Sequence, residues 1–153
     1  MMRTKIRTLR GAALLLMIAL PLVAQAADSS TFGGLTSALK DPLTSMLTSK
    51  LGVTGDQAKG GVGSYLTLAK EKLAKGDFDK IAALVPGSSK YMDSAKQLGA
   101  VSGPLGNLAG LNGALGKLGI KPETAATFVP TVTDYLGKAG GSSVTKMLGN
   151  VMK

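Results

Sequence analysis

The 153-residue sequence contains no Cys, no His and no Trp. Without Cys, disulfide scaffolds and thiol chemistry are excluded, and without His, histidine metal sites and histidine-assisted catalysis are excluded. A chain of this length is long enough to bury the core of one ordinary domain without covalent cross-links. The composition therefore excludes several enzyme classes but is compatible with a stable single-domain fold.

The N-terminus has the pattern of a Sec-type signal peptide. Four basic residues and no acid precede an apolar run over residues 11–23, and Ala24-Gln25-Ala26 supplies small residues where signal peptidase reads them. The alternative is a retained membrane anchor, but the run of about 13 residues is short for a bilayer, which needs roughly 20. We expect cleavage after Ala26, so that residues 27–153 form a single exported domain, periplasmic or secreted.

Acidic residues are few, and Arg is absent beyond residue 26. The chain has 18 Lys and Arg against 9 Asp and Glu; four of the basic residues lie in the predicted signal peptide, which leaves 14 lysines against nine acids. Arg is the usual residue for bidentate phosphate and guanine recognition, and the lysines are scattered along the sequence. We expect no nucleic-acid partner. The mild Lys excess favours weak contact with an anionic membrane surface, although solubilising surface charge is the simpler interpretation.

Strand patterns are nearly absent, and apolar residues recur at helical spacing. Helix starts are predicted at Asp41-Pro42, at a Thr54-x-x-Gln57 capping box, at Asp77, at Ser88 or Ser89 and at Pro122-Glu123, with breaks at Gly52, Pro86-Gly87 and Gly140-Gly141. The sequence therefore predicts an all-α fold, a compact bundle of about six or seven short helices separated by Gly and Pro.

Two helices contain residues that disfavour a helix interior. Gly60, Gly61 and Gly63 each cost up to about 1 kcal/mol relative to Ala, so we expect a neighbouring backbone to pack close against them. Pro130 removes one backbone donor, and we expect it to kink or split its helix.

A short internal repeat is visible at an offset of 67 residues. Leu51-Gly52-Val53-x-x-Asp56-x-Ala58 matches Leu118-Gly119-Ile120-x-x-Glu123-x-Ala125. The match fits two weakly similar helical halves, and it also fits two uses of one way to start a helix. Two copies are too few to indicate a solenoid.

Residues 97–116 carry no charge and contain six glycines. They form the core of a candidate interaction segment, whose leucines recur at helical spacing and whose glycines have the spacing of small-residue helix contacts: Leu105, Leu108, Leu111, Leu115, Leu118, Gly99, Gly103, Gly106 and Gly110. Pro104 and two Asn residues make the stretch too polar for a bilayer span. We interpret it as a buried Gly/Leu helix or flexible hairpin, or as an apolar surface occluded until a membrane or partner arrives.

The sequence offers no catalytic, cofactor-binding or metal-binding residues that we would assign. Asp77 and Asp79 are the closest acids, but positions i and i+2 point to different sides of a helix, so they cannot share a proton or a metal. Two Ser-x-x-Lys matches, at Ser37 and Ser143, lack the companion motifs of penicillin-binding enzymes. We therefore expect neither an enzyme nor a bound cofactor.

The chain also resembles a known family in its caps, glycine contacts and proline stops. The matching residues are Leu51-Gly52-Val53-Thr54, Gln57-Ala58, Gly60-Gly61, Gly63, Leu68-Ala69-Lys70, Asp77-Phe78, Leu84-Val85-Pro86-Gly87, Phe128-Val129-Pro130, Tyr135-Leu136, Gly140-Gly141, Val144 and Leu148. Together they resemble the domain-of-unknown-function family 2780, exported bacterial proteins without a known activity. The resemblance covers roughly residues 35–153 and implies a helical fold, but it transfers no functional residue.

Two functional hypotheses follow. The first is an exported, non-enzymatic helical protein of the cell envelope that binds another envelope protein or itself, with the Gly/Leu segment buried in the fold or at an interface. The second is a membrane-surface or small apolar-ligand binding protein, in which the uncharged segment acts together with lysines. The first is favoured because segment 97–116 contains no basic residue, whereas helices that bind a membrane surface usually carry Lys on their polar face.

Overall fold

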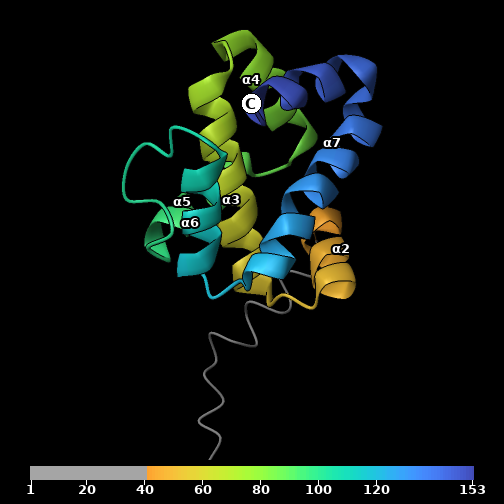
Figure 1. The fold of residues 1–153 in the computed structure, drawn as a ribbon. Coiled ribbons are helices and arrows are strands. Elements are labelled where there is room, and N and C mark those ends of the chain that lie inside the picture. Colours follow the sequence, from red (N-terminus) through yellow and green to blue (C-terminus); the bar gives the residue numbers. More distant parts are fainter. Residues whose placement is uncertain (1–40) are drawn as a thin grey trace, which may run out of the picture.

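Six helices and no strand make up residues 41–153, the part of the chain that the computed structural model describes (Figure 1). They are α2 (Pro42–Leu51), α3 (Gly55–Lys72), α4 (Lys75–Leu84), α5 (Ser88–Gln97), α6 (Leu108–Lys117) and α7 (Pro122–Val151). The predicted all-α fold class is confirmed. The predicted signal peptide lies outside the described residues.

Most helix starts follow local sequence signals. The capping box at α3 is complete: the Gln57 amide donates to Thr54 Oγ1 at 3.2 Å, and the Thr54 amide donates to Gln57 Oε1 at 2.9 Å. Pro42 occupies the first turn of α2 after Asp41, as predicted, although the Asp41 side chain forms no capping hydrogen bond. These starts were predictable because each depends on residues within one turn.

Two local predictions are wrong. Asp77 does not cap α4, which begins two residues earlier with Ala74 at the N-cap position; Asp77 lies in the first turn and accepts from Lys80 Nζ at 3.2 Å. Pro130 does not split α7, whose interruption lies at Gly141 with φ 74° and ψ −168°. Pro130 and Ala126 are both exposed, so the carbonyl that loses its donor faces solvent rather than the core.

Helix α3 is the centre of the molecule and contacts all five other helices. Its glycines make this possible, because a Cβ atom at Gly63 would collide with the Tyr91 backbone carbonyl of α5. At Gly61 the close neighbours are instead side chains, Phe128 and Leu115. Close backbone approach is therefore confirmed at Gly63, while side chains fill the space beside Gly60 and Gly61.

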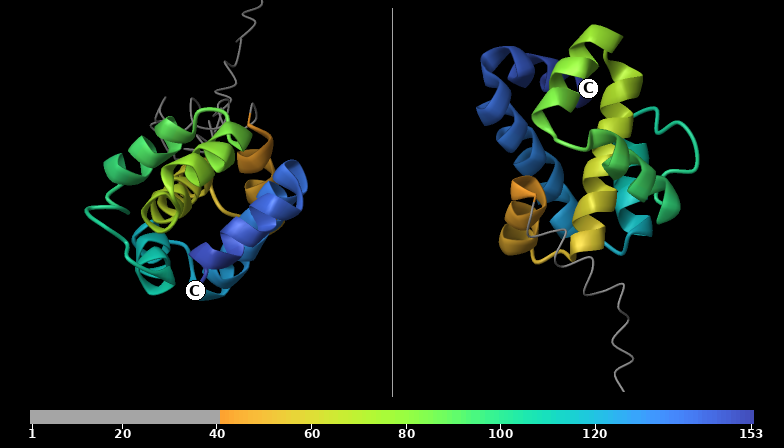
Figure 2. Two further views of the ribbon diagram at one scale, coloured as in Figure 1. Left: turned by 90° about the horizontal axis from the view of Figure 1, so that it is seen from above. Right: turned by 180° about the vertical axis from the view of Figure 1, so that it is seen from behind.

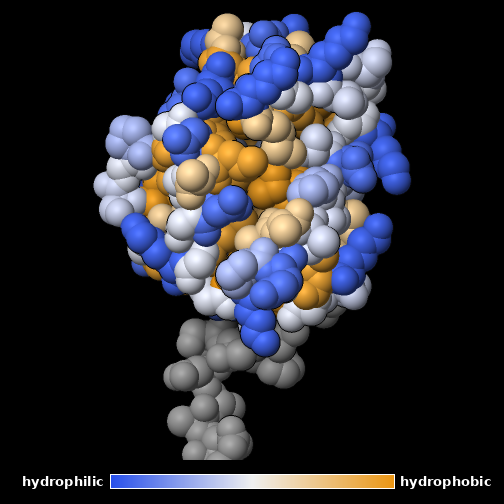
Figure 3. Space-filling view, viewed as in Figure 1, coloured by the Kyte–Doolittle hydropathy of each residue, from blue (hydrophilic) through white to orange (hydrophobic). Residues whose placement is uncertain are grey.

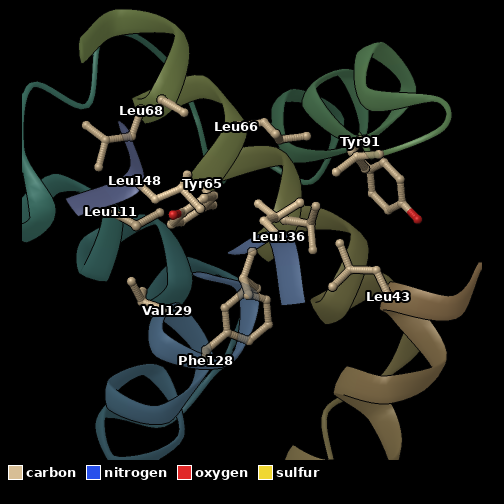
Figure 4. Packing of buried hydrophobic residues seen from close by; sticks show 14 of the residues in the cluster. Leu43, Tyr65, Leu66, Leu68, Tyr91, Leu111, Phe128, Val129, Leu136 and Leu148 are labelled. Atoms are coloured by element: carbon tan, nitrogen blue, oxygen red, sulfur yellow. The ribbon is translucent and has the colours of Figure 1, made fainter. Parts of the chain in front are cut away.

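The core surrounds α3 and takes buried residues from all six helices (Figure 4). Tyr65 and Leu68 of α3, Leu111 of α6, and Phe128 and Leu136 of α7 belong to one buried cluster, and each has an exposed fraction of 0%. Helix α5 packs on the other side of α3 from α7 (Figure 2), and its Tyr91 belongs to the same cluster.

The internal repeat extends well beyond the residues that match in sequence. Gly52 and Gly119 both adopt positive φ, 66° and 75°, each ends a ten-residue helix, and each precedes a buried aliphatic residue. Helices α3 and α7 then begin 67 residues apart. The buried residues of α3 at 58, 62, 65 and 69 have buried counterparts in α7 at 125, 129, 132 and 136.

The correspondence continues to the end of the chain. Ala74 precedes α4, and Gly141, 67 residues later, separates the last part of α7 from the rest of that helix. Ile81 and Leu148 are fully buried equivalents in these two segments. The short first helix of each unit also packs on the long helix of the other, since α2 contacts α7 and α6 contacts α3 (Figure 1). Two similar three-segment units, 42–84 and 109–151, are thus interlocked.

Candidate functional site

The leucines of the Gly/Leu segment are divided between the core and its edge. Leu111 and Leu115 are fully buried, whereas Leu105, Leu108 and Leu118 are partly buried and pack against the core. Leu115 fits beside α3 because Gly61 has no side chain. The segment therefore supplies an internal wall of the domain, and α6 is its only helical part.

The glycines of this segment do not form helix contacts with each other. Gly99, Gly103 and Gly106 lie in the irregular connection between α5 and α6, and Gly99 and Gly106 adopt positive φ of 72° and 69°. Gly110 lies in α6, where a Cβ atom would collide with the Leu105 carbonyl. The glycines shape the connection and let it lie close against the start of α6.

A carboxylate from α3 holds this connection. The backbone amide of Leu105 lies 3.0 Å from both carboxylate oxygens of Glu71, and the amide of Gly106 donates to Oε2 at 2.9 Å. Asn107 then caps α6, its Oδ1 accepting from the Gly110 amide at 2.9 Å. The partners of Glu71 lie 34 and 35 positions further along the chain, so no local sequence pattern indicates this contact.

A shallow groove opens between α6 and α7. Its volume is about 490 Å³, and its lining is small and uncharged: Asn112, Gly116, Gly119, Ile120, Pro122, Ala125 and Ala126. Figure 3 shows hydrophobic residues gathered at the centre of the face that carries α6 and α7, with hydrophilic residues around them. The groove exists because both helix walls carry Gly, Ala or Asn rather than large side chains.

A slightly larger hollow, about 520 Å³, is of a different kind. It lies beside the starts of α2 and α5, and Asp41, Lys59 and Lys90 are among its lining residues. Tyr91 also lines it, with its hydroxyl 3.0 Å from Thr44 Oγ1. The absence of charged groups distinguishes the α6–α7 groove from this hollow.

The buried tyrosines hold structural hydrogen bonds. Burial raises the pKa of Tyr91 to about 12, more than the Thr44 hydrogen bond lowers it. Burial likewise raises the pKa of Tyr65, whose hydroxyl lies 3.1 Å from Thr133 Oγ1. Both phenols therefore stay protonated at neutral pH and join α2 to α5 and α3 to α7.

The acidic side chains are dispersed. Within residues 41–153, no group of three or more acidic side chains has the arrangement of a metal site. Asp77 pairs with Lys80 on the surface of α4. Of the two Ser-x-x-Lys matches, Ser143 and Lys146 are exposed on α7, and Ser37 lies outside the described residues. In the same range no helix is long and apolar enough to cross a bilayer.

Comparison with known proteins adds one finding. No curated protein and no solved structure matches the chain. A family model matches residues 19–153, which include every described helix. The chain therefore belongs to the family described as protein of unknown function VcgC/VcgE, DUF2780.

Proposed function

We propose that this chain is an exported, non-enzymatic helical protein whose α6–α7 groove binds another envelope protein or a second copy of the chain. The observation that carries the proposal is the uncharged lining of the groove between Asn112 and Ala126. The cores of protein interfaces are depleted of charged residues, and small side chains on both walls allow a partner's backbone or apolar side chain to approach closely.

The walls of the groove are held in place by the core, which favours binding without rearrangement of the groove. Ile120 of the lining is buried, and the Gln57 side-chain amide of α3 donates at 3.0 Å to the Leu118 carbonyl in the α6–α7 connection. A partner that enters this groove meets a wall already ordered by the core. Less conformational entropy is then lost on binding.

The non-enzymatic part of the proposal rests on chemistry. The chain has no His or Cys, and the raised pKa values of Tyr65 and Tyr91 belong to groups that are committed to hydrogen bonds with Thr133 and Thr44. General acid–base catalysis needs a positioned group that titrates near the working pH. Neither tyrosine fits that role.

Export is tested by the N-terminus of the protein recovered from a bacterium that expresses the full chain. We expect the recovered protein to begin at Ala27 and to lie outside the cytoplasm, because Ala24 and Ala26 meet the requirement of signal peptidase. Recovery of a cytoplasmic protein that retains residues 1–26 would contradict the export proposal without affecting the groove.

The groove is tested with Ala126→Asp, which places a charge on its exposed α7 wall. The matched control is Ser89→Asp, an exposed first-turn position of α5 where a negative charge suits the helix dipole. We expect the native complex, or the dimer of the purified protein in sedimentation, to dissociate with Ala126→Asp and to persist with Ser89→Asp.

Two outcomes would overturn the groove proposal, provided that helicity and thermal stability show both variants folded. One is an unchanged assembly with Ala126→Asp. The other is a monomer under all conditions, in the producing cell and in purified form. Binding of a small apolar molecule in place of a protein would also count against the proposal.

A further inference from the structure

The positive charge of the molecule is concentrated at one end. This lysine-rich end consists of residues 70–84, which are the last turn of α3 and α4, and residues 137–153, which are the end of the first part of α7 and all that follows. The two segments are equivalent in the internal repeat, and they lie together at the end of the molecule opposite the α6–α7 connection (Figures 1 and 2). Seven exposed lysines belong to them: Lys70, Lys72, Lys75, Lys80, Lys138, Lys146 and Lys153.

The charge balance of this end differs from that of the rest of the described chain. The lysine-rich end has seven lysines and three side-chain carboxylates, whereas the remaining described residues have six lysines and five side-chain carboxylates. Four of the five excess positive charges of residues 41–153 therefore lie at one end, although the lysines are scattered in the sequence.

The three side-chain carboxylates of this end offset three of its seven positive charges and leave an excess of four. Glu71 is engaged by the amides of Leu105 and Gly106, and Asp77 pairs with Lys80. That pair is the one salt bridge found within residues 41–153, so the other six lysines of the end are free of a carboxylate partner there. Repulsion among these lysines is relieved when an anionic surface approaches.

We propose that the lysine-rich end docks on the surface of an anionic phospholipid bilayer. Lysine is a point charge without the planar geometry that selects one phosphate, and lysines spread over two segments suit a flat surface with many phosphates. The cores of protein interfaces are usually apolar and depleted of charged residues, unlike this end. The large hydrophobic residue found exposed within residues 41–153 is Leu98, which lies outside this end.

The proposal differs from the predicted membrane contact through residues 97–116, because Leu111 and Leu115 of that segment are committed to the core. It also goes beyond the proposed function, since it concerns a second surface. Docking through the lysine-rich end directs the α6–α7 connection away from the bilayer (Figure 1). A membrane and a protein partner are then bound at opposite ends of the molecule.

The test is flotation of the exported protein, purified without residues 1–26, with vesicles of phosphatidylglycerol and phosphatidylcholine, at low and high salt. We expect flotation at low salt that is lost at high salt, and none with phosphatidylcholine alone. The variant Lys70→Gln/Lys72→Gln/Lys146→Gln should lower the partition coefficient about 100-fold, since each lysine near such a surface contributes about fivefold.

The matched control removes the same charge elsewhere: Lys50→Gln/Lys117→Gln/Lys121→Gln, two of which are last-turn lysines like Lys70 and Lys72. We expect this control to lose less than about tenfold. Equal losses in both triple variants would overturn the proposal, because net charge alone would then explain binding. Flotation that resists salt, or no flotation at low salt, would also overturn it.

The groove variant Ala126→Asp separates the two proposals. It should float like the unaltered protein even though its protein assembly is lost. If the lysine-rich end fails this test while Ala126→Asp still disrupts assembly, only the membrane proposal falls.

Discussion

Individual residues explain why α3 tolerates three glycines in its interior. Gly63 allows the Tyr91 backbone carbonyl to approach, and Gly61 leaves room for Phe128 and Leu115. The sequence predicted that something packs closely here, because a helix does not otherwise accept the cost of such glycines. Which neighbour packs there was not predictable, since Tyr91 and Phe128 come from helices far along the chain.

We predict that Gly63→Ala destabilises the protein, because its Cβ atom would collide with backbone rather than with a movable side chain. The free energy of unfolding should fall by about 2 kcal/mol, the cost of overpacking less the gain in helix propensity. The control is Gly76→Ala in α4, where nothing lies within 4 Å and a gain of up to about 1 kcal/mol is expected. Urea unfolding of both variants measures the difference; equal stability would contradict the packing of α3 on α5.

Tyr91 gives a prediction for the dependence of stability on pH. Its pKa is raised from 10.0 to about 12 in the folded protein, so between these values the unfolded chain releases a proton that the folded protein keeps. The contribution of Tyr91 to stability is complete below pH 10 and is lost as the pH rises towards 12. In Tyr91→Phe the free energy of unfolding should therefore fall less steeply across this window, and identical slopes would contradict the burial of the phenol.

Several helix starts and breaks could be predicted from neighbouring residues in the sequence, whereas the connection between α5 and α6 could not. The α3 capping box, the break at Gly141 and the start of α7 at Pro122 were predictable because each rests on neighbouring residues. Residues 98–107 were not, since their conformation depends on Glu71, which no periodicity singles out. The prediction that Pro130 splits its helix was wrong because the carbonyl that loses its donor faces solvent, and the sequence does not show which side of the helix the proline faces.

The two repeat units differ because, within residues 41–153, only the first is followed by a helix, α5, that covers its long helix. Helix α5 covers α3, where Gly63 faces the Tyr91 backbone, and Gly60 lies beside Leu118 and beside Leu98 just after α5. The positions 67 residues later are Thr127 and Pro130, both exposed on α7, and no helix follows the second unit within the described residues. A covered helix face carries small residues, whereas the equivalent open face carries residues suited to solvent.

We predict that Glu71→Gln loosens the connection between α5 and α6. A neutral amide accepts weaker hydrogen bonds from the Leu105 and Gly106 amides than a carboxylate does. Hydrogen exchange at these two amides should become about tenfold faster, corresponding to a loss of roughly 1.4 kcal/mol. Exchange in the core of α3, for example at Leu66, should change much less, and unchanged exchange at Leu105 would show that Glu71 does not hold the connection.

At the scale of the whole molecule, the two repeat units depend on each other. Helix α2 packs on α7 and α6 packs on α3, so neither unit buries its own first helix alone. We therefore predict one cooperative unfolding transition, in which far-ultraviolet circular dichroism and tyrosine fluorescence coincide. Two separated transitions in urea would contradict the interlocked arrangement.

The overall class was predictable from helical periodicity, absent strand patterns and the short repeat at Gly52 and Gly119. The arrangement was not, because the packing of α2 and of α6 against both long helices depends on contacts between distant segments. For the same reason the α6–α7 groove escaped prediction. Its lining residues, such as Asn112 and Ala126, become a surface only when the two helices meet.

We propose that a protein partner binds in the α6–α7 groove. The most direct measurement places a photo-crosslinking amino acid at Ala126 in the producing cell, with the same group at Ser89 as the control. We predict one discrete adduct from position 126, either twice the mass of the chain or the chain with a single partner, which Asn112→Asp across the groove removes. No adduct from 126, or the same adducts from 126 and 89, would contradict the claim.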